Sequence, residues 1–423
     1  MSFNADTPLA EWLAWLEQLH PLEIDLGLQR VQQVFDVLNP EFNNTRVITI
    51  AGTNGKGSCA AMLEAIFLQA ELNVGVYTSP HLLRFNERIR INGVEASDST
   101  ITAALANVEA VRNDVSLTYF EYTTLAALQC FANANVDVMV LEVGLGGRLD
   151  AVNIIDSDVA LITTVDLDHQ SWLGDTRDEI GREKAGILRS DRPAVIADPA
   201  MPHSVIDYAD EIGANVSLAG RDFLYSIDEQ QWYWTHVELG TVDALPILDL
   251  PGEHQYQNAA AVIEVIHQLP DIAVTDVDVI AGLGNISIVG RGQQLAEMPN
   301  WRFDVAHNPQ AIEALAQTLS DEKHLGRRHA ICSMLDDKDI ETALKPMLLC
   351  VDTWWIFDLQ QPRAAKVERL VAAIQTQDSH ASINIFPDAD ALLAAIASNV
   401  ESQDEVVVFG SFLTVAQIMQ PCI

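Results

Sequence analysis

The chain has 423 residues, and its 60 Asp and Glu residues against 24 Lys and Arg residues give a formal net charge of −36 at pH 7. This length exceeds what one hydrophobic core usually supports and predicts two domains. The negative charge excludes general affinity for nucleic acid or for anionic membranes, so we expect neither as a partner. Basic residues should therefore gather locally wherever an anion binds.

Neither the cysteines nor the N-terminal segment carries a signal for disulfides, metal binding or export. Five cysteines occur without a C-x-x-C pair, which indicates neither a zinc site nor a disulfide framework and fits a reducing cytoplasm. Near the start, Leu9, Trp12, Leu13, Leu16 and Leu19 have helical spacing, and no basic stretch precedes them. We predict an amphipathic helix there and a cytoplasmic protein, with no signal peptide and no membrane span.

Four short β-rich runs punctuate the first 170 residues, and helix-like segments separate most of them. They are RVITIAG at 46–52, NVGVYTS at 73–79, VDVMVLEVG at 136–144 and DVALITTVD at 158–166. This alternation predicts a doubly wound, mostly parallel α/β sheet. Ligands of such sheets bind beyond the carboxyl ends of the strands, and each of these runs ends in groups able to handle phosphate, metal or protons.

The remainder of the chain indicates a second, smaller domain. Residues 190–250 are β-rich and irregular, and a helix is predicted in GEHQYQNAAAVIEVIHQL. Glycines then break the pattern at GLGNISIVGRG, after which a second alternation of strands and helices begins with WRFDVAH. We predict a P-loop domain at 1–285, a linker at 286–292 and a Rossmann-like α/β domain at 293–423.

The segment GTNGKGS at 52–58 joins the first predicted strand to a segment with helical spacing. It fails the usual P-loop pattern G-x-x-x-x-G-K-[ST], because Gly57 separates Lys56 from Ser58. The physics still favours phosphate: glycines let the backbone wrap an anion, the helix start directs N–H groups at it, and Lys56 supplies a charge. An ordinary glycine-rich turn is the alternative.

The other strand ends carry candidate metal ligands. Glu142 enters a glycine-rich turn and could hold Mg²⁺, which prefers oxygen ligands and shares its coordination with phosphates; a turn-stabilising carboxylate is the alternative. Ser79 could add a hydroxyl ligand, although it also suits a simple turn before Pro80. His169, in DLDH, could be a ligand or a hydrogen-bonded structural residue.

An arginine-rich segment offers a candidate anion contact. HLLRFNERIRINGVE concentrates Arg84, Arg88 and Arg90 in a strongly acidic chain. Arginine suits bidentate recognition of carboxylate or phosphate, so a clamp for an anionic substrate is one interpretation. Exposed charges that pair with Glu87 and Glu95 are an equal alternative.

Four further positions have ionisable side chains but little supporting context. Arg291 lies in the predicted linker and could neutralise charge on a transferred phosphoryl group. Asp304 and His307, in DVAHNP, end the first strand of the second predicted domain. Lys184, in DEIGREKAGIL, is on residue physics alone an ordinary solvated charge.

Together the motifs resemble the dihydrofolate synthase/folylpolyglutamate synthase family. The matching segments include GTNGKGS, YTSPHL, NERIRING, YFEYTTLAAL, LEVGLGGRLDAVN, DHQSWLGDT, REKAGI, GEHQYQNAA, VGRGQ and DVAHNP. They occur in the family's order and cover nearly the whole chain. This family belongs with the Mur ligases, which are ATP-dependent amide-forming enzymes, and the G-x-x-G-K-G-[ST] loop is the form that superfamily uses.

The resemblance implies a role for each matching residue. The residues implied to bind ATP are Gly52, Thr53, Asn54, Gly55, Lys56, Gly57, Ser58, Asn258, Arg291, Asp304 and His307. The implied Mg²⁺ ligands, for two metal sites, are Ser79, Glu142 and His169. The acceptor-binding residues, with Arg84 added from the arginine-rich segment, are Arg84, Phe120, Arg148, Asp150 and Ala151. The implied catalytic residues are Lys56, His169, Lys184 and Arg291, and Lys184 matches a lysine that becomes carbamylated.

The activity that the resemblance implies is a ligation. A monomer would use ATP to join L-glutamate to dihydropteroate or to a reduced folate through an acyl phosphate, releasing ADP and phosphate. Polyglutamylation alone and another Mur-type amino-acid ligase are the near alternatives. A P-loop kinase and a non-catalytic nucleotide-binding module are more distant ones.

Overall fold

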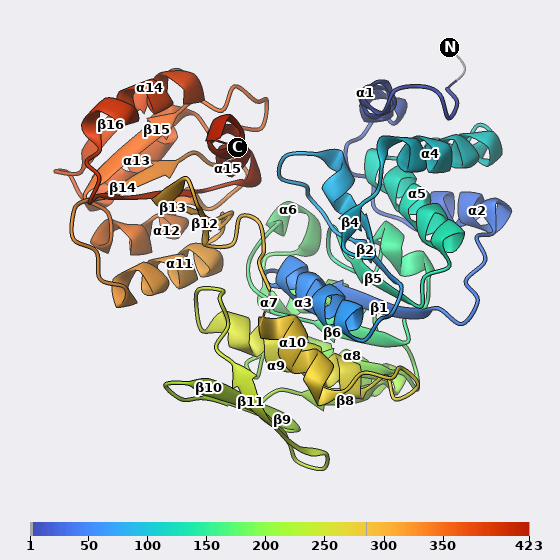
Figure 1. Ribbon diagram of the computed structural model, residues 1–423. Helices are drawn as coiled ribbons and strands as arrows, with labels where there is room; N and C mark the ends of the chain where they lie inside the picture. Colours follow the sequence, from blue (N-terminus) through green and yellow to red (C-terminus); the bar gives the residue numbers. More distant parts are fainter. Residues whose placement is uncertain (1–2, 285, 423) are drawn as a thin grey trace. The chain divides into compact units, whose positions relative to one another are not determined.

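The computed structural model describes residues 3–284 and 286–422, which form two compact units (Figure 1). The first unit comprises Met1–Leu248 and Tyr256–Ile286. The second comprises Asp249–Gln255 and Ser287–Ile423. In the described part of the chain, no helix is both long enough and apolar enough to cross a bilayer.

An eight-stranded sheet forms the centre of the first unit. Its strands, in sheet order, are β4 (Val94–Glu95), β3 (Ile89–Ile91), β2 (Val74–Tyr77), β5 (Val138–Glu142), β1 (Arg46–Ala51), β6 (Val159–Ile162), β7 (Pro193–Ile196) and β8 (Asn215–Leu218). Strands β2, β5, β1, β6, β7 and β8 pair in parallel. Strands β3 and β4 extend the β2 edge in antiparallel pairs. The carboxyl ends of the six parallel strands therefore meet at one edge of the sheet.

Helices and a small antiparallel sheet complete the chain up to residue 284. The helices are α1 (Leu9–Leu19), α2 (Gln29–Leu38), α3 (Lys56–Gln69), η1 (Phe85–Arg88), α4 (Asp98–Arg112), α5 (Tyr119–Ala134), η2 (Ala151–Ile154), α6 (Gln170–Leu173), α7 (Arg177–Ala185), α8 (His203–Ile212), α9 (His254–His267) and α10 (Asp276–Gly284). The small sheet has the order β11 (Gly240–Pro246), β10 (Gln231–His236), β9 (Phe223–Ile227). Helix α10 packs closely on α3, where a Cβ on Gly282 would lie 2.7 Å from Ile66 Cα (Figure 1).

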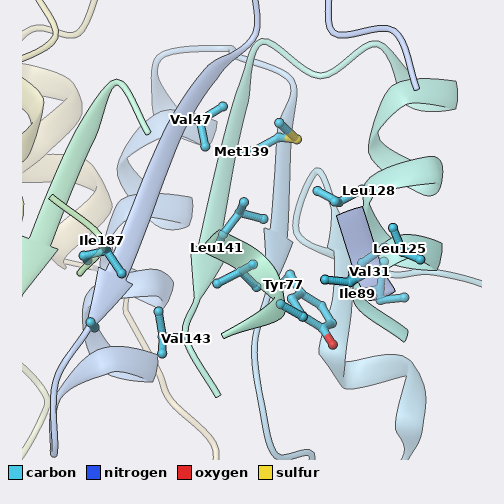
Figure 2. Close-up of a cluster of buried hydrophobic side chains, with 14 of the residues drawn as sticks. Val31, Val47, Tyr77, Ile89, Leu125, Leu128, Met139, Leu141, Val143 and Ile187 are labelled. Carbon is cyan, nitrogen blue, oxygen red and sulfur yellow. The ribbon is translucent and has the colours of Figure 1, made fainter. Parts of the chain in front are cut away.

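The core of the first unit forms because its parallel strands are almost continuously apolar. Strands buried on both faces lack the alternation of half-exposed strands, and all five residues of β5 are buried. Figure 2 shows Tyr77 of β2, Ile89 of β3 and Leu141 of β5 packed beside Leu125 and Leu128 of α5. This packing fixes the strand ends that carry the polar residues described below.

The second unit has a six-stranded sheet of its own. Its strands, in sheet order, are β12 (Gln293–Leu295), β13 (Met298–Phe303), β17 (Glu405–Phe409), β14 (Arg328–Cys332), β15 (Thr353–Phe357) and β16 (Ser382–Phe386). All neighbours pair in parallel except β12 with β13. Its helices are α11 (Pro309–Asp321), α12 (Ile340–Ala343), η3 (Lys345–Leu349), α13 (Val367–Gln377), α14 (Ala389–Asn399), α15 (Phe412–Met419) and η4 (Gln420–Cys422).

The predicted fold class is confirmed. The four β-rich runs of the first part are strands β1, β2, β5 and β6, and the later series gives β13 to β17. The predicted N-terminal helix is α1, with Leu9, Trp12 and Leu16 buried. Strands β3 and β4 are additions that the sequence did not predict.

Candidate active site

Two glycines shape the loop between β1 and α3. The backbone of Gly52 has φ +154°, and a Cβ there would lie 1.8 Å from Thr163 Oγ1. Gly55 has φ +91°, and its Cβ would lie 2.6 Å from Asn258 Oδ1. A side chain at either position would collide with its neighbour, so this loop conformation requires both glycines. The same contact places the amide of Asn258, which the resemblance implies to bind ATP, against the loop.

The end of β6 holds this loop in place. The N–H of Thr53 donates to the carbonyl oxygen of Thr164 at 2.7 Å, and the N–H of Asn54 donates to Thr164 Oγ1 at 3.1 Å. In return, Thr163 Oγ1 donates to the carbonyl oxygen of Asn54 at 2.6 Å. The loop is thus fixed before any ligand arrives, which lowers the entropy that binding must remove.

Lys56 is the first residue of α3, and its side chain folds back over the loop. Its Nζ donates to the carbonyl oxygens of Gly52 at 2.9 Å and Thr53 at 3.2 Å. The ammonium group and the N-terminus of α3 therefore present positive charge at the same place. This geometry is that of an anion-binding loop, although its residue spacing departs from the common pattern.

Glu142 lies beside the loop at the carboxyl end of β5. It is buried, and its Oε2 accepts a hydrogen bond from the backbone N–H of Ser79 at 3.1 Å. A Cβ on Gly57 would lie 3.9 Å and 4.0 Å from the two oxygens of Glu142. The structure therefore brings together Ser79, Glu142 and the glycine loop, three of the predicted positions.

His169 lies at the carboxyl edge of the sheet, at the start of α6. Its backbone is left-handed, with φ +52°, and its N–H donates to Asp168 Oδ1 at 2.8 Å. Its Nε2 is 3.9 Å from Asp168 Oδ2. Among residues 3–284 and 286–422, no group of three or more His, Cys, Asp or Glu side chains forms a metal site. Such a sparse donor set fits Mg²⁺, which is commonly held by one or two carboxylates together with substrate phosphates.

Lys184, on α7, is not a surface charge. The residue is 4% exposed, and a capping box between Thr176 and Glu179 fixes the start of its helix. Burial, and next the positive charge of Lys56, lower the pKa of Lys184 to about 7, while Asp168 opposes this shift. The mutual influence of these three groups indicates that Lys56, Asp168 and Lys184 share one electrostatic site.

Asp150 organises the glycine-rich turn after β5. Its Oδ2 accepts the N–H groups of Gly144 and Leu145, and its Oδ1 accepts that of Val152. Burial raises the pKa of Asp150 to about 6, whereas the three N–H groups and Lys56 oppose the rise. Ala151 follows in η2 and is buried. The carboxylate of Asp150 therefore stabilises the conformation of this turn through three backbone hydrogen bonds.

The other predicted acceptor residues differ in exposure. Phe120 is the second residue of α5, and its Cζ lies 2.7 Å from the place that a Cβ on Gly144 would occupy. Its ring centroid is 5.9 Å from that of Tyr77. Arg148, half exposed, forms an ion pair with Glu183 at 2.8 Å. Phe120 therefore lies against the turn after Glu142, and Arg148 lies toward solvent.

The three arginines of the arginine-rich segment do not form one clamp. Arg90 pairs with Glu64 of α3 through Nε and Nη2, each at 2.8 Å. The side chain of Arg84 is 65% exposed, and its contact with Glu95 is 3.9 Å long. Arg84 thus follows the alternative of an exposed pair. Of these three arginines, Arg88 is the one for which the described chain offers no carboxylate partner.

The second unit carries its own charged cluster around Arg291. The guanidinium lies 5.7 Å from the ring centroid of Phe412, and the ring of His307 is 6.2 Å from the same residue. Burial raises the pKa of Asp304, and Arg291 opposes this rise. Burial and Arg291 lower the pKa of His254 to about 4.

Sequence analysis missed Phe412 and His254 as members of that cluster. Phe412 begins α15, three residues after the end of β17 at Phe409, within the segment FGSF. The rule that ligand groups follow strand ends could have found it. His254 has no such signal, because it begins α9 and reaches the cluster through tertiary packing alone.

Comparison with known proteins decides the family. The profile described as "Mur ligase middle domain" matches residues 50–266, and "Mur ligase, glutamate ligase domain" matches residues 290–412. The chain is 43% identical to the dihydrofolate synthase/folylpolyglutamate synthase of Escherichia coli K12 over 420 residues, which covers 99% of this chain and 96% of the relative. The chain belongs to the dihydrofolate synthase/folylpolyglutamate synthase family of Mur ligases.

Solved structures of the dihydrofolate synthase/folylpolyglutamate synthase family share this fold. E. coli FolC in complex with DHPP and ADP superposes with a TM-score of 0.93 at 41% identity, covering 100% of this chain and 99% of that one. A bifunctional folylpolyglutamate synthase/dihydrofolate synthase with Mn, AMPPNP and L-glutamate bound gives 0.90 at 42% identity, covering 99% of both chains. The expected family is therefore confirmed.

Proposed function

We propose that this chain is an ATP-dependent ligase that adds L-glutamate to dihydropteroate, forming dihydrofolate, and to reduced folates, extending a polyglutamate tail. The observation that carries the proposal is the convergence of the loop at Gly57, the carboxylate of Glu142 and the pair Lys56 and Lys184 at one sheet edge. The names of the relatives, and the ADP, AMPPNP, DHPP and L-glutamate named in their structures, support these substrates.

The chemistry must make a carboxylate reactive at neutral pH. An oxygen of the acceptor carboxylate attacks the γ-phosphorus of ATP, the bond from that phosphorus to the bridging oxygen breaks, and ADP leaves. The amino group of L-glutamate then attacks the carbonyl carbon of the acyl phosphate, loses a proton and expels phosphate. Lys56 and the N-terminus of α3 offset the negative charges that must approach one another in the first step.

We propose that Ser79, Glu142 and His169 would hold Mg²⁺, for which the family implies two sites. Bound Mg²⁺ would supply charge neutralisation on the phosphates. The carboxylate of Glu142 suits this role because it faces the glycine loop and is oriented by the N–H of Ser79. His169 would bind the metal through its imidazole, whose Nε2 lies 3.9 Å from Asp168 Oδ2.

Lys184 is proposed to carry a carbamate. The neutral amine is the form that adds CO₂, and a lysine with a pKa of about 7 supplies that form near neutral pH. The addition replaces a buried cation near Lys56 by an anion, so repulsion between two cations becomes attraction. A carbamate there would add oxygen atoms that help to organise the metal site.

The remaining assignments follow the family. Phe120, Arg148, Asp150 and Ala151 are proposed to receive the pterin part of the acceptor, with Asp150 acting through the shape of the turn. Arg291, Asp304 and His307, together with Asn258 in the first unit, are proposed to contact ATP. Cys59, Cys130, Cys332 and Cys350 are free thiols, which supports the expected location in a reducing cytoplasm.

The test is product formation by the full chain with ATP and Mg²⁺. We expect ADP and phosphate to appear only when L-glutamate and an acceptor are both present, and dihydropteroate and tetrahydrofolate should each be glutamylated. Mass spectrometry of the acceptor should show the addition of one glutamate residue at a time. Release of AMP, or turnover without glutamate, contradicts the proposal. Glutamylation of tetrahydrofolate alone would leave only the polyglutamate activity.

A further inference from the structure

Arg88 is a half-buried cation whose protein contacts are all uncharged or aromatic. Its Nε donates to His81 Nδ1 at 2.9 Å. Its guanidinium carbon lies 5.7 Å from the ring centroid of Phe85 and 5.6 Å from that of Tyr119. Within residues 3–284 and 286–422, no Asp or Glu oxygen lies within 4.0 Å of its guanidinium nitrogens. Most other arginines of this acidic chain have such a partner.

The contacts of Arg88 fix its geometry for a ligand. The two rings hold the planar guanidinium by cation–π attraction. The imidazole nitrogen Nδ1 of His81 accepts the hydrogen bond that the Nε–H of Arg88 donates, which fixes the rotation of the guanidinium plane. The Nε–H is therefore engaged, and the terminal nitrogens Nη1 and Nη2 form the edge that suits a carboxylate in a two-bonded pair.

Arg88 lies at the sheet edge that carries the acceptor residues. Its carbonyl oxygen accepts the N–H of Thr78 at 3.0 Å, so it is paired with the residue before Ser79. Tyr119, under the guanidinium, directly precedes Phe120 in α5. Phe120 in turn contacts Tyr77, on which the charge of Arg88 also acts.

Arg88 is nevertheless set back from the phosphate loop. It precedes β3, and the sheet order places β2 and β5 between β3 and β1, the strand that leads into the loop. Neighbouring strands are about 4.8 Å apart, so three steps correspond to roughly 14 Å. This separation of the backbones favours a part of the acceptor away from the γ-phosphate as the group that Arg88 addresses.

We propose that Arg88 binds a non-reacting carboxylate of a glutamylated folate acceptor and thereby distinguishes that acceptor from dihydropteroate. A folate presents α-carboxylates in addition to the γ-carboxylate that reacts, whereas dihydropteroate has only its reacting carboxylate. Arg88 is thus a specificity residue for one of two acceptors. This inference rests on the proposed function, because it presumes that folates are acceptors.

The test compares Arg88→Gln with the wild type on both acceptors, at saturating ATP and glutamate. We expect KM for tetrahydrofolate to rise about 10-fold or more, equivalent to about 1.4 kcal/mol, with kcat little changed. KM for dihydropteroate should stay within about twofold, because that acceptor makes no such contact. Arg88→Lys should recover part of the loss, since it keeps a cation without the two-bonded edge.

The control is Arg112→Gln, a second arginine of the first unit that lies over an aromatic ring, 5.4 Å from Trp15. It should change thermal stability and leave the ratio of the two KM values unaltered. An equal rise in both KM values for Arg88→Gln would show a purely structural role and overturn the inference, as would no change in either. A wild-type enzyme inactive with both acceptors would instead refute the proposed function.

Discussion

Lys184 should carry a carbamate when the protein is equilibrated with bicarbonate at pH 8. Its pKa is lowered from 10.5 to about 7, chiefly by burial and next by Lys56. At pH 8 roughly nine-tenths of a lysine with that pKa is neutral amine, against about 0.3% at the ordinary value. Because CO₂ adds only to the neutral amine, the reactive fraction rises by roughly 300-fold. At pH 6 most of Lys184 is protonated, so the carbamate should diminish.

The assay is carbon-13 NMR of the protein in labelled bicarbonate. We expect one carbamate resonance at pH 8 that weakens toward pH 6 and disappears in Lys184→Met. The matched control is Lys323→Gln, which removes an exposed lysine of the second unit and should keep the resonance. Persistence of the signal in Lys184→Met, or its absence from the wild type at pH 8, would refute the reasoning.

Three further predictions test the same site. Gly55→Ala should weaken ADP binding, measured by calorimetry, about 10-fold or more, because the added Cβ would collide with Asn258 Oδ1. The control Gly240→Ala, which has a similar φ of +97° but open space around it, should alter stability only. Equal effects of the two substitutions on ADP binding would contradict the steric argument. Glu142→Gln should lower ADP release by roughly 100-fold while metal-free ADP binding persists, and unchanged turnover would exclude it as a ligand. Without bicarbonate and below pH 7, Lys184→Met should have a larger free energy of unfolding in urea than the wild type. This difference should shrink by about 1.4 kcal/mol per pH unit above pH 7. A difference that does not change with pH would argue against the lowered pKa of Lys184.

The sign of that last prediction follows from proton binding. The folded pKa of Lys184 is about 7 and the unfolded value is 10.5. Below pH 7 both states bind the proton, so the wild type bears the full cost of a buried ammonium group. Between the two values only the unfolded state is protonated, so wild-type stability rises with pH. Methionine has no such dependence.

Much of the fold follows from local sequence signals. Strands β1, β2, β5 and β6 are short apolar runs bounded by polar turns. Their local preference for strand agrees with their place in the buried sheet. Strands β3 and β4 have only three and two residues, with arginine and glutamate among them. They form a hairpin around the dipeptide Asn92-Gly93, a local turn signal that sequence analysis missed, and the β2 edge supplies the hydrogen-bonding partners of β3.

The site divides in the same way. The role of the glycine loop follows from the chemistry of Lys56 and its neighbours in spite of the unusual spacing. The fates of Arg84, Arg88 and Arg90 do not, because the partner of Arg90 is Glu64, 26 residues away on α3. Lys184 had a signal that residue-by-residue reading misses: Lys56 and Lys184 are the only lysines among the first 322 residues. In this part of the chain every other long basic side chain is an arginine, so the two lysines indicate positions that need an amine.

Lys56 and the buried Lys184 explain how a strongly acidic chain can bind anionic substrates. Exposed carboxylates act through water, where the screening length is about 8 Å at physiological ionic strength. Lys56 and Lys184 interact inside the protein, where charges act on each other more strongly. Their repulsion, which helps to keep Lys184 neutral, is relieved when a phosphate group approaches Lys56 or when Lys184 becomes an anion. The net charge of −36 therefore discourages polyanions at large, while the attraction for a nucleotide is confined to the loop where Lys56 and the N-terminus of α3 present positive charge.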